Sequence, residues 1–322
     1  MLFSMMALLA ATQGGFQTDT TFTVAQGTRL QVETQGGDIT VRAWDRNQVR
    51  VQASHSRRTH VNVQSSGAVV ILEAEAERGP ANMVDYTLTV PAWMALNLEG
   101  MYSTIDVTGV RGAVTAETLE GDITVKGPAE SLRLESVQGR IIAEGARGAA
   151  TLTTVSEGIE ASDMHGDLIA ETVSGNIVLR QINAKIVEAE TVSGTIILDG
   201  RILDGGSYTL LTHSGGVMVT IAEGSNVNIA TATGSGSVRA SFPLPAGERP
   251  SRRRQNYHLG SGSATLDIEA FSGSILLLRP ADMAERLNQI TRAREERARE
   301  RQKPKPEHDD QHDREPTDQT GS

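Results

Sequence analysis

The amino-acid sequence predicts an all-β fold: a parallel β-solenoid with coils of about 18–21 residues, an N-terminal antiparallel β region, and a short C-terminal helix with a disordered tail. Three observations predict it. A small-residue anchor, usually Gly-x-Ile or Gly-x-Val, recurs through residues 101–280, and apolar residues alternate with polar ones around it. The chain also has 32 glycines and only 3% aromatic residues. A fixed repeat is the signature of stacked units, and period-two alternation is typical of strands with one buried face.

The anchors define the repeat over 101–280. Each is numbered by the residue two positions before its Ile or Val. The first four steps between anchors are 18 residues, the next three are 19, 21 and 21, and the last is 37 and holds an insertion at 241–258. The anchors are Ser103, Gly121, Gly139, Glu157, Gly175, Gly194, Gly215, Gly236 and Gly273.

The N-terminal segments have other roles. Residues 1–15 are predicted to be a signal peptide, because the apolar run at 2–11 is too short to span a bilayer. The chain is therefore expected to be exported to the periplasm, the cell surface or the medium. Residues 16–100 alternate without the repeat. They begin with one coil motif at Gly37 and then depart into antiparallel strands, and we expect them to cap the solenoid, since an open coil end is an unpaired strand edge.

A row of hydroxyl residues precedes the anchors on the inward face of the predicted strands. Buried hydroxyls need hydrogen-bond partners, which stacked coils supply from a neighbouring hydroxyl or the backbone. A structural role is therefore favoured over an ice-binding or crystal-binding array, which would face outward. The row is Thr118, Ser136, Thr154, Thr172, Thr191, Thr212 and Thr233.

The C-terminal part changes composition. Residues 281–302 are predicted to form a helix, with Met283, Leu287 and Ile290 on one stripe that would cover the last coil as a lid. Residues 303–322 are predicted to be disordered.

Composition and motifs exclude several classes of function. With no cysteine, the chain has no disulfide, thiolate metal site or cysteine nucleophile. The net charge of −10 disfavours a nucleic-acid partner. The histidines lack ligand spacing, and the serine-hydrolase elbow, phosphate-binding loop and dinucleotide fingerprint are absent from the sequence. We therefore expect no cofactor, no metal, no transmembrane segment and no catalysis.

Three sets of residues are candidate interaction surfaces. An outward row of carboxylates, interrupted by Thr153, is read as a solubilising face, a weak cation site or a pair of glycosidase carboxylates about 5 Å apart. Four arginines in the insertion could bind phosphates or uronic acids, or could be solvated. An apolar outward row either lies under other chain or forms a partner surface. The sets are Glu117, Glu135, Glu171 and Glu190; Arg249, Arg252, Arg253 and Arg254; and Ile142, Val178, Ile197 and Met218.

The segments YTLTVP, GDITV, TVSGNIVL, TVSGTIIL, Phe242-Pro243 and GSGSATLDIEAFSGSILL occur in this order. Over roughly residues 20–280 the chain resembles the bacterial putative-adhesin family of exported β-strand-repeat proteins, a domain of unknown function. The resemblance implies a right-handed-type β-solenoid in the cell envelope or outside the cell. It brings no catalytic motif with it.

The sequence thus predicts a monomeric, non-catalytic, exported solenoid that acts as an adhesin-like or scaffold protein. Its partner would be an envelope or extracellular protein or glycan. Two alternatives stay open. One is a carbohydrate-active β-helix enzyme, a hydrolase or lyase, that uses the outer glutamates. The other is a filament-forming solenoid of the bactofilin type.

Overall fold

The structure is a computed structural model that describes residues 18–77, 79, 83–245 and 254–301, and the side chains of the last range as far as 292. The predicted signal peptide, the tail at 303–322 and Arg249, Arg252 and Arg253 lie outside the described residues. The chain divides into two compact units, residues 1–283 and 284–322. Every strand that the structure describes belongs to the first unit.

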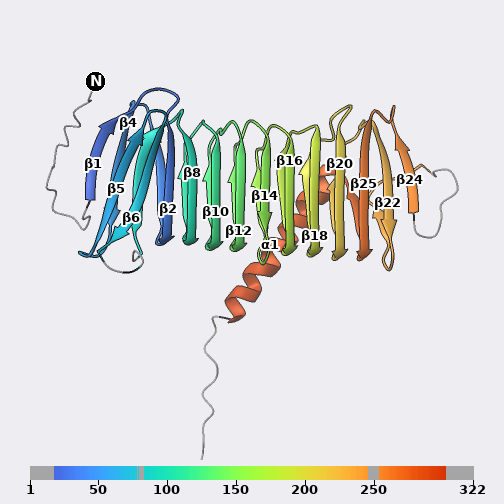
Figure 1. The fold of residues 1–322 in the computed structure, drawn as a ribbon. Helices are drawn as coiled ribbons and strands as arrows, with labels where there is room; N and C mark the ends of the chain where they lie inside the picture. The colour runs from blue at the N-terminus through green and yellow to red at the C-terminus, as the bar shows by residue number, and fades with distance from the viewer. Residues whose placement is uncertain (1–17, 78, 80–82, 246–253, 302–322) are drawn as a thin grey trace, which may run out of the picture. The chain divides into compact units, whose positions relative to one another are not determined.

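Two sheets of 13 strands form this unit (Figure 1). Sheet A has the strand order β1-β4-β7-β3-β9-β11-β13-β15-β17-β19-β21-β26-β23. Sheet B has the order β24-β22-β25-β20-β18-β16-β14-β12-β10-β8-β2-β6-β5. The N-terminal strands are β1 (Thr18–Thr23), β2 (Arg29–Gly36), β3 (Ile39–Trp44), β4 (Gln48–Ser54), β5 (Thr59–Ser66), β6 (Val69–Ala76) and β7 (Asp85–Pro91).

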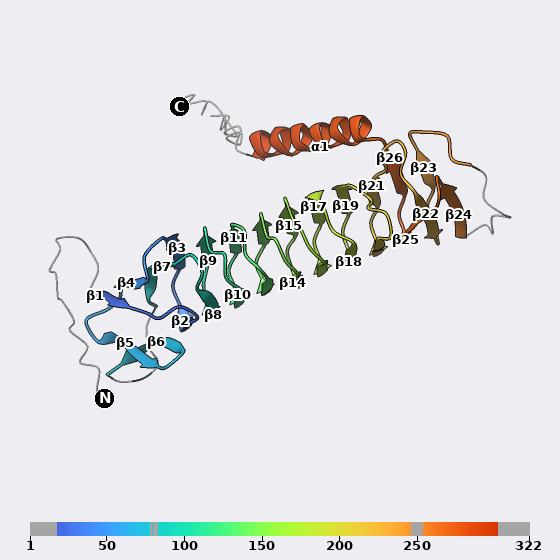
Figure 2. The same cartoon turned by 90° about the horizontal axis from the view of Figure 1, so that it is seen from above.

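The middle of the unit is a regular stack in which each coil gives one strand to sheet B and the next to sheet A (Figure 2). The strands of sheet B are β8 (Ala95–Tyr102), β10 (Val114–Glu120), β12 (Leu132–Gln138), β14 (Ala150–Thr154), β16 (Leu168–Ser174), β18 (Ile186–Ser193) and β20 (Ser207–Ser214). Those of sheet A are β9 (Ile105–Thr108), β11 (Ile123–Lys126), β13 (Ile141–Glu144), β15 (Ile159–Ser162), β17 (Ile177–Ile182), β19 (Ile196–Gly200) and β21 (Val217–Thr220). All are parallel, and the register is regular, with Val114 opposite Leu132 and Leu132 opposite Ala150, except for a shift between Arg180 and Ile182 in the β17–β19 pair. The predicted solenoid is therefore confirmed.

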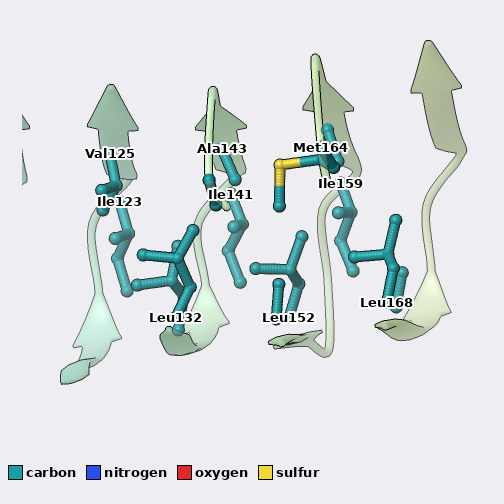
Figure 3. Close-up of a cluster of buried hydrophobic side chains, with 14 of the residues drawn as sticks. Ile123, Val125, Leu132, Ile141, Ala143, Leu152, Ile159, Met164 and Leu168 are labelled. Atoms are coloured by element: carbon teal, nitrogen blue, oxygen red, sulfur yellow. The ribbon is translucent and has the colours of Figure 1, made fainter. Parts of the chain in front are cut away.

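The core lies between the two sheets and is almost entirely aliphatic. Figure 3 shows side chains from successive coils, such as Ile123, Ile141 and Ile159, lying one behind another in this space. Each is 0% exposed. A coil of about 18 residues can bury only a few such side chains, so stability depends on burying the faces of each coil against its neighbours.

The hydroxyl row lies at the corner between the sheets, and each member donates a hydrogen bond to a backbone carbonyl one coil away. Thr118 Oγ1 bonds to Ser103 O at 3.1 Å, Thr154 Oγ1 to Gly139 O at 2.8 Å, and Thr191 Oγ1 to Gly175 O at 3.1 Å. The predicted structural role is confirmed. The glycine anchors follow from the same close stacking, because a Cβ on Gly194 would lie 1.9 Å from the oxygen of Gly175.

The coils do not follow chain order at the two ends, although the repeat suggests sequential stacking. At the N-terminal end, the β2–β3 coil lies between β8–β9 and the outermost pair β6–β7, and β1, β4 and β5 add antiparallel pairings. At the other end, the β25–β26 coil lies between β20–β21 and the outermost β22–β23, and β24 pairs antiparallel with β22. These last strands are β22 (Val227–Thr233), β23 (Val238–Ala240), β24 (Arg254–Leu259), β25 (Ala264–Ser272) and β26 (Ile275–Leu278).

This arrangement corrects the prediction of a loop over 241–258. Residues 254–258 belong to β24, which uses its backbone groups to pair with β22. The prolines at 243 and 245 forbid ladder hydrogen bonds only at their own positions, so the chain resumes strand pairing after them.

The helix α1 covers Pro280–Arg301, with Asp282 in its first turn. Met283, which belongs to the first unit, is 0% exposed. The role of the helix as a lid stays a prediction. Among the described residues, no helix combines the length and apolar character needed to cross a membrane.

Candidate binding groove on the outer face of sheet B

The predicted carboxylate row lies on the outer face of sheet B and is longer than the sequence suggested. Glu117 lies opposite Glu135 in register, and Glu171 opposite Glu190, with Thr153 between the two pairs. Three more glutamates continue the row beyond Glu117, so that five adjacent strands, β6, β2, β8, β10 and β12, each contribute one carboxylate. We call these five the glutamate ladder: Glu73, Glu33, Glu99, Glu117 and Glu135.

Two of these additional residues have a signal in the sequence. Glu33 and Glu99 stand four residues before Gly37 and Ser103, as Glu117 stands four before Gly121. Counting back from those anchors would have found them. Glu73 has no such signal, because β6 lies in the region without the repeat.

Like charges directly opposite one another destabilise a sheet, and neighbouring side chains offset part of this repulsion. Gln31 donates a hydrogen bond to Glu33 at 2.6 Å, Asn97 donates one to Glu99 at 2.8 Å, and Arg133 forms an ion pair with Glu135. Each donor stands two residues before its glutamate on the same strand. Glu117 and Glu73 have no hydrogen-bond or ion-pair partner among the described residues, so their carboxylates are available to a ligand.

A second row, which the sequence analysis did not identify, runs beside the ladder two residues further along each strand. We call it the aliphatic ridge. Six of its side chains are 38–48% exposed: Met101, Leu119, Val137, Val155, Val173 and Val192. Each stands two residues before an anchor, where strict alternation places a side chain outside, so the signal was present in the sequence. A contiguous exposed apolar row of this kind marks a contact surface.

A groove of about 800 Å³ lies between the ladder and the N-terminal half of the ridge. The ladder forms one bank, and Met101, Leu119, Val137 and Val155 form the other. A second hollow of about 480 Å³ lies between the same two rows nearer the C-terminal end, where its lining includes Glu190, Val192, Glu269 and Phe271. The lining of the larger groove includes no aromatic ring on which a sugar could stack. Carboxylates facing aliphatic side chains suit the binding of a ligand that is both cationic and apolar.

The predicted apolar row on sheet A is covered. Val178, Ile197 and Met218 are only 6–7% exposed, and Ile142 is half-buried. In β17 three consecutive residues, 177–179, are buried, which shows that both faces of sheet A are covered there. Whether this row lies under other chain or binds a partner stays a prediction.

The arginine set is described only at Arg254. This residue begins β24, and its guanidinium lies 3.7 Å from the carboxylate of Asp267. In the part of the chain that the structure describes, no group of three or more His, Asp or Glu side chains is placed to hold a metal ion.

Three solved structures are similar to this chain. A putative cell adhesion protein from Clostridium sporogenes is 10% identical, with 81% of this chain and 99% of that chain covered and a TM-score of 0.22. A putative adhesin from Parabacteroides distasonis is 10% identical, with 80% and 96% covered and a TM-score of 0.39. A putative adhesin from Bacteroides fragilis is 13% identical, with 82% and 98% covered and a TM-score of 0.33.

No curated protein is significantly similar to the chain. The model of the Toastrack DUF4097 family matches residues 27–278, from the start of β2 to the end of β26. This span contains both rows of the groove. Because it covers well over half of the sequence, the chain belongs to the Toastrack DUF4097 family.

Proposed function

We propose that the chain is an exported, non-catalytic interaction protein of adhesin-like type that binds its partner along the groove on sheet B. The observation that carries the proposal is the aliphatic ridge, six exposed apolar side chains, five on strands of sheet B and Val155 directly after β14. Such a row is costly to leave in water and gains free energy when a partner covers it. The names of the similar solved structures agree with a role in adhesion.

The solenoid suits binding because it holds both rows rigidly before the partner arrives. Each member of the ladder and the ridge lies on, or for Val155 directly after, a strand that pairs with neighbours on both sides. A preformed surface loses little conformational entropy on association, which favours affinity. An open groove without an enclosing wall is a poor place to exclude water from a reaction, and this supports a non-catalytic role.

Export and a monomeric state are parts of the same proposal. They rest on the predicted signal peptide and on the antiparallel strands β1, β5 and β24 at three of the four sheet edges. Cell fractionation of the tagged protein, combined with protease treatment of intact cells, tests export. Surface, released or periplasmic protein supports it, and cytosolic protein overturns it and favours the filament alternative.

The binding surface is tested by replacing ridge valines with threonine, which keeps the branched shape and adds a hydroxyl. The variant carries Val137→Thr, Val155→Thr, Val173→Thr and Val192→Thr, and its binding to isolated cell envelopes is measured. We expect at least a tenfold loss of affinity. The control carries Thr115→Val and Thr151→Val, which place similar apolar groups on sheet B outside the groove.

Two results would end the proposal: unchanged binding by the ridge variant, or equal loss in the control. Treating the envelopes with protease or periodate before the assay then separates a protein partner from a glycan. The in-register pair Glu117 and Glu135 keeps the carbohydrate-active enzyme as a second candidate. Glycan turnover that is lost in Glu117→Gln and Glu135→Gln would establish it.

A further inference from the structure

The ridge changes from aliphatic to aromatic at its C-terminal end. After Val192, the next two residues in the row are His213 on β20 and Phe271 on β25. Their rings are stacked, with centroids 4.8 Å apart and planes inclined by 6°. The spacing is that of neighbouring strands, so the register of the sheet holds the two rings face to face.

The opposite face of the Phe271 ring has no side chain beside it in the row. The next strand is β22, and Gly234, which directly follows it, occupies the corresponding place, because Thr233 pairs with Ala270. A Cβ built on Gly234 would lie 3.1 and 3.2 Å from two carbons of the Phe271 ring. The ring therefore leans over this glycine, which places no side chain against it, and Phe271 is 61% exposed.

One carboxylate lies beside this ring. Glu269 stands two residues before Phe271 on β25, and Glu190 lies further along the same outward row, on β18, beyond the strand that carries His213. Both line the hollow of about 480 Å³ that also contains His213 and Phe271. Neither has a hydrogen-bond or ion-pair partner among the described residues. An aromatic face with unpaired carboxylates around it is the combination that recognises organic cations.

We propose that the open face of Phe271 binds a lysine or arginine side chain of an extended partner polypeptide lying along the ladder and the ridge. Glu269 neutralises the cation, and the ladder draws further basic side chains along the same bank. The inference rests on the proposed function, since it names the chemistry of the partner at the same surface. Charge complementarity favours this occupant over a neutral glycan, because the two hollows together offer many carboxylates and one exposed phenylalanine ring.

The test measures binding of the full chain to a synthetic peptide of alternating lysine and valine. A second peptide has every lysine acetylated, which removes the charge and keeps the length. The variants are Phe271→Trp, which keeps and strengthens the aromatic face, and Phe271→Leu, which keeps an apolar side chain and removes the ring. Tyr102→Leu, which removes an exposed ring that lines neither hollow, is the matched control.

We expect Phe271→Leu to weaken binding of the lysine peptide at least fivefold, with Phe271→Trp equal to or tighter than wild type and Tyr102→Leu unchanged. The acetylated peptide should bind weakly and be indifferent to Phe271→Leu. Phe271 is well exposed, so these variants should keep the thermal stability of the wild type.

The inference is overturned if Phe271→Leu binds the lysine peptide as wild type does, or if its loss is equal for both peptides. It is also overturned if wild type binds neither peptide, or if a neutral oligosaccharide depends on Phe271 more strongly than the lysine peptide does. None of these results contradicts the proposed function if the ridge valines are still needed for envelope binding.

Discussion

The middle of the solenoid and its two ends are built by different rules. From β8 to β21, chain order and stacking order agree, and each coil from β10–β11 to β18–β19 pairs with the coil before it and the coil after it along the chain. At both ends the order is broken in the same sense. The coils that begin and finish the stack along the chain, β2–β3 and β25–β26, are second from the end, and β6–β7 and β22–β23 lie outside them.

This difference shows how a stack of identical layers is closed. A terminal coil with no further strand beside it would expose an unpaired parallel edge. Such a coil could also detach from the stack, starting at the chain terminus. Here the first and last coils of the chain are held between neighbours on both sides. Antiparallel strands then cover three of the exposed edges, and the fourth edge, β23, has only three residues and is followed by Pro243 and Pro245.

The largest expected effect contrasts corner glycines in the two regions. Gly194→Ala in the middle places a Cβ 1.9 Å from a backbone oxygen that the coil stack holds in place, whereas Gly67→Ala in the β5–β6 hairpin meets nothing within 4 Å. Gly67 has φ +61°, so its substitution still strains the backbone by about 1 kcal/mol. We expect Gly194→Ala to lower the free energy of unfolding by about 4 kcal/mol or more. Denaturant titration measures both, and similar losses would contradict a stack held by close backbone contact.

The next effect concerns two buried tyrosines. Tyr86 on β7 has no hydrogen-bond partner among the described residues, and burial raises the pKa of its hydroxyl to about 12. Tyr208 in the middle donates to Ala184 O and accepts from Leu203 N, both at 2.8 Å. At neutral pH, Tyr208→Phe should therefore cost about 1–3 kcal/mol and Tyr86→Phe almost nothing.

At alkaline pH, Tyr86→Phe should become more stable than the wild type. The unfolded chain releases the Tyr86 proton near its ordinary pKa of 10, whereas the folded protein keeps it until about pH 12. The stability present below pH 10 is thus lost as the pH rises from 10 to 12, by up to about 2.7 kcal/mol. Unfolding of Tyr86→Phe and wild type, compared across this range, should show the difference. Parallel curves would contradict it.

A smaller effect distinguishes hydrogen-bonded hydroxyls from a hydroxyl without a described partner at the corners between the sheets. Thr154→Val removes a buried hydroxyl that donates to Gly139 O at 2.8 Å, and we expect a loss of about 1–2 kcal/mol. Ser103 stands at the anchor of the β8–β9 coil, where its buried hydroxyl has no partner among the described residues, so Ser103→Ala should be neutral or slightly stabilising. Thermal unfolding of the two variants measures this. A larger loss in Ser103→Ala would mean that the hydroxyl row is not the source of the corner stability.

The same contrast explains how much the sequence could predict. The repeat, the inward hydroxyls and the glutamates at a fixed distance from their anchors follow from local rules, because every coil in the middle meets the same neighbours. The position of the β25–β26 coil between β20–β21 and β22–β23 depends on pairing between segments that are distant in the chain, which the sequence repeat does not reveal. Glu73 could not be predicted for that reason. The ridge could have been predicted, because alternation before each anchor places it on the same face as the glutamates.

The smallest effect tests whether the ladder stores repulsion that a basic partner would relieve. Glu117 lies between Glu99 and Glu135, whereas Glu171 has Glu190 on one side and Thr153 on the other. Glu117→Gln should therefore raise the free energy of unfolding by about 0.5 kcal/mol at low salt, and Glu171→Gln by roughly half as much. Both gains should shrink in 0.5 M salt, because exposed charges are screened within a few ångströms there. If Glu117→Gln instead destabilises the protein at every salt concentration, the ladder is held by favourable contacts, and the attraction of a cationic partner must come from the ring of Phe271 and from Glu269 beside it.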